Sequence, residues 1–287
     1  MLAKIAFALA ATFSTSAFAQ FTSTDVTRFY QVYDAAKGRP GAAELQRGYL
    51  DGGSPGVHGF IPHRIVSADN LATQIARQPG IYEKARGCLP ALATLQSRVP
   101  ALIDRLKALY PKTRQPQVSI VIGAGNAGGT VSPDGVIIGL EVACQDRAGS
   151  PLSLDERLVA LVAHELVHTQ QRGFADGTLL AASLNEGIGE FVGELLAGHV
   201  HNEHLRSWTE GRQAALDARF RAAMHRKDLS GWIYNGTGTP DAPGDLGYWQ
   251  GYRIAKAYYE RSVDKAAAIA RLLEETDAQA LLRDSGW

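Results

Sequence analysis

The pentapeptide His164-Glu165-Leu166-Val167-His168 constrains this chain more than any other feature of its sequence. On an α-helix, residues four positions apart lie on one face about one turn apart, so both imidazoles can point at one metal ion. Glu165 lies roughly 100° further round the helix, beside the metal rather than among its ligands. Its carboxylate can accept a proton from a zinc-bound water. The spacing therefore predicts a helix that holds Zn²⁺ and a general base.

The flanking residues predict that this helix runs from about residue 154 to residue 172 and is largely buried. Ser153 and Glu156 have the spacing of a capping box, and Gly173 is a plausible stop. The competing interpretation is a buried helix whose two histidines only form hydrogen bonds. Burying two histidines and a glutamate without a partner is costly, which favours the metal site.

The next acidic helix supplies a third ligand. Glu186 stands eighteen positions after His168, inside Leu184-Asn185-Glu186-Gly187-Ile188-Gly189-Glu190-Phe191. This segment resembles the Asn-Glu-Gly segment of gluzincin metallopeptidases, in particular the zinc aminopeptidases. The resemblance implies that Glu186 is the third Zn²⁺ ligand and that Glu190, one turn later, orients His164. Glu194 is the next acid on the same face of this helix. It either has a similar role or belongs to a solvated helix face.

A wider resemblance covers most of the chain. Four segments occur in the same order as in a bacterial family of predicted zinc-dependent proteases of unknown function, related to gliding-motility lipoproteins. They are Gly128-Gly129-Thr130, the His-Glu-x-x-His pentapeptide, the Asn-Glu-Gly segment and Gly247-Tyr248-Trp249-Gln250-Gly251-Tyr252. The resemblance implies one zincin-like metallopeptidase domain over residues 20–287.

Hydrophobic periodicity predicts an α+β fold that is mostly helical, with a small β-sheet before the catalytic helix. β-Branched residues dominate 118–122 and 135–142, and Pro133-Asp134-Gly135 is a turn signal between them. Apolar residues at three- and four-residue spacing, typical of helices, fill the other long stretches. These are residues 23–110, 178–227 and 247–285.

Residues 123–128 match the Gly-x-Gly-x-x-Gly dinucleotide motif, but they lead into a turn and a strand instead of a helix. We therefore do not expect nucleotide binding. In gluzincins the strand before the catalytic helix binds the substrate backbone by β-addition. Gly128, Gly129 and Thr130 are the candidates for that role, and a plain hairpin loop is the alternative.

Tyr248 and Tyr252 are the candidate donors to the oxyanion of a tetrahedral intermediate. They stand four positions apart after the breaker-rich loop 235–244, and Tyr248 is favoured because it begins the helix. Both could instead be packing aromatics. The histidines of the 199–204 segment, or His225, are alternative donors. That segment could also form a second metal site or a solvated helix end.

Residues 1–19 are predicted to be a signal peptide, with Lys4, a short apolar run and an Ala-x-Ala cleavage site at 17–19. No other segment is long and apolar enough to span a bilayer. The chain is therefore expected to be exported, periplasmic or secreted, without stable membrane insertion after cleavage. Cys88 and Cys144 predict one disulfide in that setting, with zinc ligation as the alternative. Equal numbers of basic and acidic residues, 29 each, give no basic surface for nucleic acid.

These observations predict an exported zinc-dependent peptidase acting on a peptide or protein substrate. One alternative is a zinc-bearing binding or assembly protein of the cell envelope without turnover, against which the intact Glu165 argues. Another is a different zinc amide hydrolase, such as a deformylase or an amidase. The Asn185-Glu186 pair speaks against a deformylase.

Overall fold

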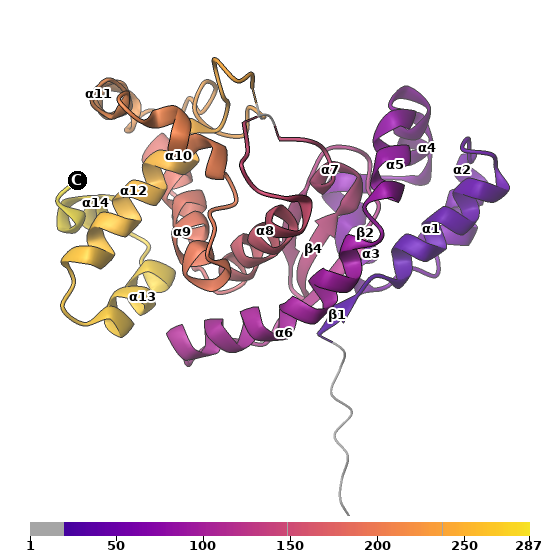
Figure 1. Ribbon diagram of the computed structural model, residues 1–287, viewed down its shortest axis with the longest axis horizontal. Helices are drawn as coiled ribbons and strands as arrows, with labels where there is room; N and C mark the ends of the chain where they lie inside the picture. Colours follow the sequence, from indigo (N-terminus) through magenta and orange to yellow (C-terminus); the bar gives the residue numbers. More distant parts are fainter. Residues whose placement is uncertain (1–19, 148, 237) are drawn as a thin grey trace, which may run out of the picture.

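A mixed β-sheet lies at the centre of the computed structural model, which describes residues 20–147, 149–236 and 238–287 (Figure 1). Within these residues the sheet has four strands in the order β1-β2-β4-β3. The strands are β1 (Phe21–Thr22), β2 (Gln117–Val121), β3 (Gly129–Ser132) and β4 (Gly135–Gly139). Strands β1, β2 and β4 run parallel, and β3 pairs antiparallel with β4 at the edge of the sheet. The predicted signal peptide, residues 1–19, lies outside the described residues.

The central strands are covered on both faces, which explains their uninterrupted apolar sequences. Every residue of β4 is buried, whereas the edge strand β3 is partly exposed along its length. Helix α3 (Pro55–Phe60) packs on one face, where Gly59 lies against Ile137. Helix α8 (Leu154–His168) contacts β3 and β4, with Gly129 directed at it. The second predicted strand ends early, because α7 (Leu140–Ala143) follows β4 at once.

The N-terminal third is helical, as predicted. Its residues 24–87 lie on one side of the sheet, whereas the helix of residues 91–109 packs along α8 (Figure 1). Four aromatic rings from three of its helical segments pack with centroids 5.2 to 5.9 Å apart: Phe29, Tyr30, Tyr49 and Tyr82. Two segments are single π-helical stretches. The elements not yet named are α1 (Thr24–Ala35), α2 (Ala42–Leu45), η1 (Gln46–Leu50), η2 (Ile61–Ile65), α4 (Ala68–Arg77), α5 (Pro79–Gly87) and α6 (Ala91–Leu109).

Helix α8 begins as its sequence predicts and ends earlier. Ser153 caps it through the predicted capping box with Glu156. Its last residue is His168 rather than residue 172. The following residues are drawn into tertiary hydrogen bonds instead: the Gln170 side chain bonds the backbone of Arg114. Long-range contacts thus override local helix propensity in this segment.

The C-terminal half is a set of helices on the other side of the sheet (Figure 1). Helix α9 (Leu179–Ala197) packs between α8 and α12 (Leu246–Arg261). The other helices are α10 (Glu203–Thr209), α11 (Gln213–Ala223), α13 (Lys265–Glu274) and α14 (Ala278–Ser285). The predicted α+β class, mostly helical with a small sheet, is confirmed. None of the described helices has the length and apolar character needed to cross a membrane.

Glycines set the approach of α9 to α12. A Cβ added at Gly251 would overlap the carbonyl oxygen of Ser183, and one at Gly187 would overlap the backbone of Gly251. The two backbones therefore touch, and no side chain fits between them. This contact fixes where α12 presents its tyrosines relative to the residues of α9.

We expect Gly251→Ala to lower the free energy of unfolding by about 3 kcal/mol, because the methyl group must push the two helix backbones apart. Urea titration of both proteins measures this as a lower midpoint. Gly80→Ala is the matched control: its Cβ meets no atom within 4 Å, and the helical position gains up to about 1 kcal/mol. Equal midpoints for Gly251→Ala and wild type would show that the contact is looser than described.

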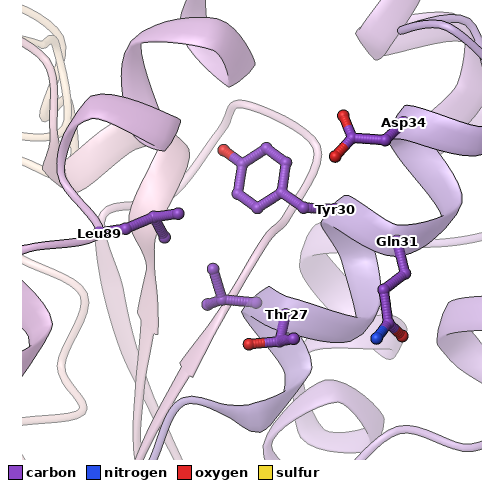
Figure 2. A pocket seen from close by; sticks show the side chains of 6 residues that line it. Thr27, Tyr30, Gln31, Asp34 and Leu89 are labelled. Atoms are coloured by element: carbon purple, nitrogen blue, oxygen red, sulfur yellow. The ribbon is translucent and has the colours of Figure 1, made fainter.

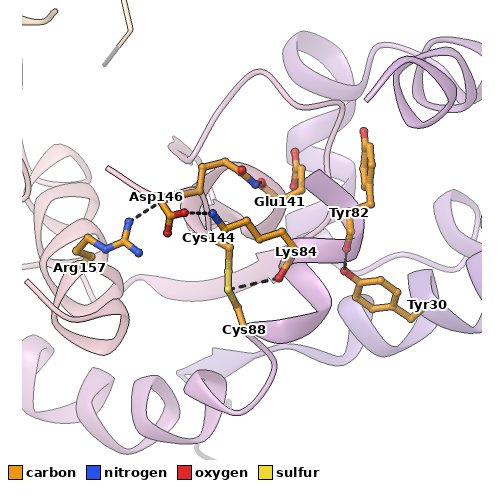
Figure 3. The surroundings of a disulfide bond; sticks show 9 residues. Tyr30, Tyr82, Lys84, Cys88, Glu141, Cys144, Asp146 and Arg157 are labelled. Atoms are coloured by element: carbon orange, nitrogen blue, oxygen red, sulfur yellow. Dashed lines mark hydrogen bonds and ion pairs between the residues drawn. A yellow bond between two sulfur atoms is a disulfide. The ribbon is translucent and has the colours of Figure 1, made fainter. Parts of the chain in front are cut away.

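A disulfide joins Cys88, at the end of α5, to Cys144, at the end of α7 (Figure 3). The two Cα atoms are 6.3 Å apart and the bridge closes a 56-residue separation. Next to it, the buried carboxylate of Glu141 accepts the backbone N–H groups of Gly123 and Gly125 at 2.9 and 3.0 Å. Burial raises the pKa of Glu141 to about 7. The bridge and this carboxylate hold the glycine-rich loop that leads into β3.

A surface hollow lies beside α1, lined by Val26, Thr27, Tyr30, Gln31, Asp34 and Leu89 (Figure 2). Its acid, Asp34, is paired with Arg86, whose guanidinium also covers the ring of Tyr30. The hollow gathers no set of groups suited to metal binding or acid–base chemistry.

Candidate metal centre

Helices α8 and α9 bring three ligand atoms together: Nε2 of His164, Nε2 of His168 and Oε2 of Glu186. The two nitrogens are 2.9 Å apart, and the carboxylate oxygen is 3.3 Å from each of them. These are the three residues that the sequence predicts as metal ligands. The structure therefore gathers them into one cluster across two helices.

The geometry and the donor types fit zinc. Tetrahedral Zn²⁺ with ligands at about 2.0–2.1 Å holds its ligand atoms roughly 3.3 Å apart, close to the observed separations. Two imidazoles and one carboxylate are a donor set found in catalytic zinc sites, which keep one position open. His164 is buried, whereas His168 and Glu186 remain partly exposed. The cluster is thus reachable from one side.

Two glycines of α9 make this convergence possible. A Cβ at Gly189 would lie 2.9 Å from Cε1 of His164, and one at Gly193 would lie 3.2 Å from its backbone nitrogen. Any larger residue there would move α9 away from α8 and carry Glu186 off the histidines. The glycines stand four positions apart in an otherwise apolar helix, and that spacing is the sequence signal for the close approach.

Gln171 orients His168, a role that sequence analysis did not identify. Its Oε1 accepts from Nδ1 of His168 at 2.5 Å, and its Nε2 donates to the Asn185 carbonyl at 3.0 Å. With the proton on Nδ1, the lone pair of Nε2 faces the cluster, as a metal ligand requires. The only signal in the sequence is the three-residue spacing from His168.

Glu190 lies behind His164, as the resemblance implies, at ion-pair rather than hydrogen-bond distance. Its Oε1 is 3.7 Å from Nδ1 of His164, which has no hydrogen-bond partner among the described residues. Asn202 holds both oxygens of Glu190, through its backbone N–H at 3.2 Å and its side-chain amide at 2.5 Å. Burial raises the pKa of Glu190.

Glu165 is buried beside the edge strand. A Cβ added at Gly129 would overlap its carboxylate, so the β3 backbone passes directly over the predicted base. Burial is the main cause that raises the pKa of Glu165. The structure thus brings Gly129, predicted to bind substrate, onto the predicted base. Gly128 and Thr130 flank it, and both belong to the pairing of β3 with β4.

Charge coupling within the cluster is strong. Burial raises the pKa of Glu186, but His168 and His164 outweigh it and hold that pKa well below its usual value. Burial lowers the pKa of His168, but the Glu186 carboxylate outweighs it and raises that pKa to about 9. Without another cation the histidine therefore carries the positive charge that balances this carboxylate.

Two tyrosines border the cluster. The Tyr248 ring stacks beside His164, with centroids 6.1 Å apart, and no hydrogen bond among the described residues uses its hydroxyl. Tyr234, which sequence analysis did not identify, donates its hydroxyl to Oε1 of Glu186 at 2.8 Å. It is 61 % exposed and has a left-handed backbone, φ 56°. Tyr234 lies in an irregular loop, so no helical or strand periodicity in the sequence points to it.

Tyr252, the less favoured of the two candidate oxyanion donors, is not brought to the cluster. Its hydroxyl donates to Glu194 at 2.7 Å and accepts from Lys256 at 3.1 Å. Glu194 is also paired with Arg206. Helix α12 packs tightly along α9. Tyr252 lies one turn further along α12 than Tyr248, and its hydroxyl therefore meets Glu194 instead of the ligand residues.

The histidines of the 199–204 segment do not form a second metal group with other described residues. His199 lies 3.7 Å from Glu156 at the surface. The His201 ring is 5.7 Å from the His164 ring, centroid to centroid, so this histidine borders the centre. His204 is buried, and neither of its ring nitrogens has a partner in the described structure. His225 bonds Gln279 at 3.1 Å.

Comparison with known proteins adds one finding. The sequence model of a family described as gliding motility protein GldB matches residues 234–287. The matched stretch contains Tyr234, Tyr248 and helices α12 to α14, and it begins after the ligand-bearing helices. The expected similarity to gliding-motility proteins is therefore confirmed for this C-terminal part. No curated protein matches the chain.

Proposed function

We propose that this chain is an exported zinc-dependent peptidase. The observation that carries the proposal is the convergence of His164, His168 and Glu186, with Glu165 beside them under an open strand edge. A carboxylate base, a three-ligand metal site with an accessible side and an unpaired strand edge are the parts that hydrolysis of an extended peptide requires.

Bound zinc would act as a Lewis acid toward water and the substrate carbonyl. Glu165 takes the proton of the attacking water and delivers it to the leaving amine. The free edge of β3 aligns the substrate backbone through main-chain hydrogen bonds. Tyr248 donates from its unengaged hydroxyl to the carbonyl oxygen as negative charge develops there.

We expect Tyr248→Phe to lower kcat by about 10²-fold with unchanged zinc content, because it removes a donor to the oxyanion and leaves the ligands in place. Steady-state kinetics on one cleaved peptide, with zinc measured by mass spectrometry of the metal, test this. Tyr234→Phe is the comparison, since it removes only the hydrogen bond to Glu186. If Tyr248→Phe is fully active and Tyr234→Phe is impaired, Tyr234 is the donor instead.

An envelope setting is consistent with the similarity of residues 234–287 to gliding motility protein GldB. It also agrees with the predicted signal peptide and with the disulfide, since disulfides persist in oxidising compartments. We propose a periplasmic or secreted enzyme acting on peptides or proteins at the cell envelope.

Cleavage of a diverse peptide mixture, read by mass spectrometry, tests the peptidase proposal. Zinc-loaded wild type is compared with Glu165→Gln under the same conditions. New termini produced by the wild type alone establish the activity, and their positions distinguish exopeptidase from endopeptidase. Equal cleavage by both proteins would assign the activity to a contaminant and overturn the proposal.

A second candidate is a zinc-bearing binding or assembly protein of the envelope without turnover. The family match favours it in one respect, since it covers α12 to α14 and none of the ligand-bearing residues. Stoichiometric zinc together with no cleavage in the peptide mixture would support this candidate over the peptidase. Another zinc amide hydrolase would instead cleave small amide substrates and leave peptides intact.

A further inference from the structure

Arg147 places a guanidinium beside the metal centre without an acidic partner. It follows α7 and is partly exposed, and its Nη1 donates to Oδ1 of Asn202. Among the described residues, no carboxylate lies within ion-pair distance of it. Other arginines of this chain are paired, for example Arg206 with Glu194 and Arg253 with Asp217.

An unpaired guanidinium in this position has spare binding capacity. The group carries five N–H donors, and within the described structure only the bond to Asn202 uses them. Burial lowers the pKa of Arg147, which reports a cation held in poorly hydrated surroundings. An anion that reaches it there gains more than it would at an exposed arginine.

Asn202 connects Arg147 to the metal centre. This asparagine accepts from Arg147 and donates to Glu190, the acid behind His164. Arg147 also interacts electrostatically with Tyr248 and with His201, whose rings lie next to that of His164. The guanidinium therefore lies on the His164 side of the cluster.

The two acids near Arg147 have partners of their own. Asn202 donates to both oxygens of Glu190, and Asp245 accepts from the backbone N–H of Asn235 at 3.1 Å. Neither acid forms an ion pair with Arg147 at the distances described. The free N–H groups can thus take an additional carboxylate in the paired geometry that guanidinium groups favour.

We propose that Arg147 forms a carboxylate-binding subsite beside the metal centre, so that the substrates are peptides with a carboxylate close to the scissile bond. This inference rests on the proposed peptidase function. The carboxylate has two sources, the C-terminus of a short peptide or the side chain of an aspartate or glutamate. The first makes the enzyme a remover of C-terminal residues, and the second makes it selective for acidic sequences.

Paired peptides distinguish the sources and test the subsite. One pair differs only by a free or amidated C-terminus, and the other only by glutamate or glutamine next to the scissile bond. For one of the pairs, the wild type is expected to show a kcat/KM ratio of at least about 10 in favour of the carboxylate. In Arg147→Gln that ratio falls to about one, and Arg147→Lys retains part of it.

Arg157→Gln is the matched control, because Arg157 bonds the Gln145 carbonyl in the same region and, among the described residues, forms no hydrogen bond or ion pair with the centre. It should keep the wild-type ratio. Because each ratio compares two peptides on one protein, partial unfolding of a variant does not change it. A wild-type ratio near one for both pairs, or a ratio unchanged by Arg147→Gln, overturns the subsite.

Binding separates this inference from the peptidase proposal. Fluorescence anisotropy of labelled peptide pairs is measured with zinc-loaded Glu165→Gln, alone and combined with Arg147→Gln. Carboxylate-dependent binding that needs Arg147 supports the subsite, even when the wild type cleaves nothing and the peptidase proposal fails. Binding that is equal for both members of each pair overturns the subsite, even when cleavage is observed.

Discussion

Glu165→Gln is expected to bind zinc like the wild type and to cleave peptides roughly 10²–10⁴-fold more slowly. Glutamine has nearly the shape of glutamate, so it fits beside Gly129 without moving β3. It cannot accept the proton of the attacking water, which is the role assigned to this carboxylate. The ligand atoms belong to other residues, so the metal site is unchanged.

The measurement combines kcat/KM on one cleaved peptide with the zinc content of the same preparation. Asp155→Asn serves as the matched control, since it neutralises another acid of α8 at its exposed first turn. Full activity in Glu165→Gln would show that another group accepts the proton. Loss of zinc in Glu165→Gln would show that this carboxylate supports the metal site.

Glu186→Ala is expected to weaken zinc binding by more than about 10²-fold, since removal of even an outer partner of a metal ligand costs 10–100-fold. Oε2 of Glu186 is one of the three converging atoms, and alanine leaves two histidines that cannot close the site. Competition with a chromophoric chelator measures the affinity. On the proposed zinc site, the wild type should be stabilised by added zinc and Glu186→Ala should not.

Glu190→Ala is the comparison for this experiment. Its carboxylate stands 3.7 Å from Nδ1 of His164, outside the cluster, so its loss should weaken zinc binding about 10–100-fold. If Glu190→Ala loses zinc completely and Glu186→Ala retains it, the assignment of the third ligand moves to Glu190. Wild-type affinity in both variants would exclude a role for α9 in metal binding.

The candidate site divides into residues that periodic patterns identify and residues that they miss. His164 and His168 lie one turn apart on one helix, a relation that depends only on helix geometry. The capping box at Ser153 is equally local and is confirmed. Glu186 required the resemblance of its segment to a known motif, because its distance from the histidines is set by packing between two helices.

The residues that the sequence did not identify act through long-range contacts. Gln171 follows the end of α8, where tertiary hydrogen bonds of Gln170 stop the helix four residues before the predicted end. Tyr234 lies in an irregular loop, and Arg147 reaches the centre only through Asn202. No repeat of 3.6 or 2 residues relates Tyr234 or Arg147 to the ligands, and only a three-residue spacing relates Gln171 to His168.

The sequence by itself determined the helix that carries the histidines, residue types suited to a zinc site, the two central strands and the mostly helical α+β class. These features depend on short-range periodicity and on side-chain chemistry. Tertiary structure alone decided that α9 comes close enough to α8 for Glu186 to join the histidines, and that Glu194 holds the Tyr252 hydroxyl away from them. The physical reason is the close approach at glycines. Gly189 leaves room for the His164 ring against α9, and the backbones of α9 and α12 touch at Gly251.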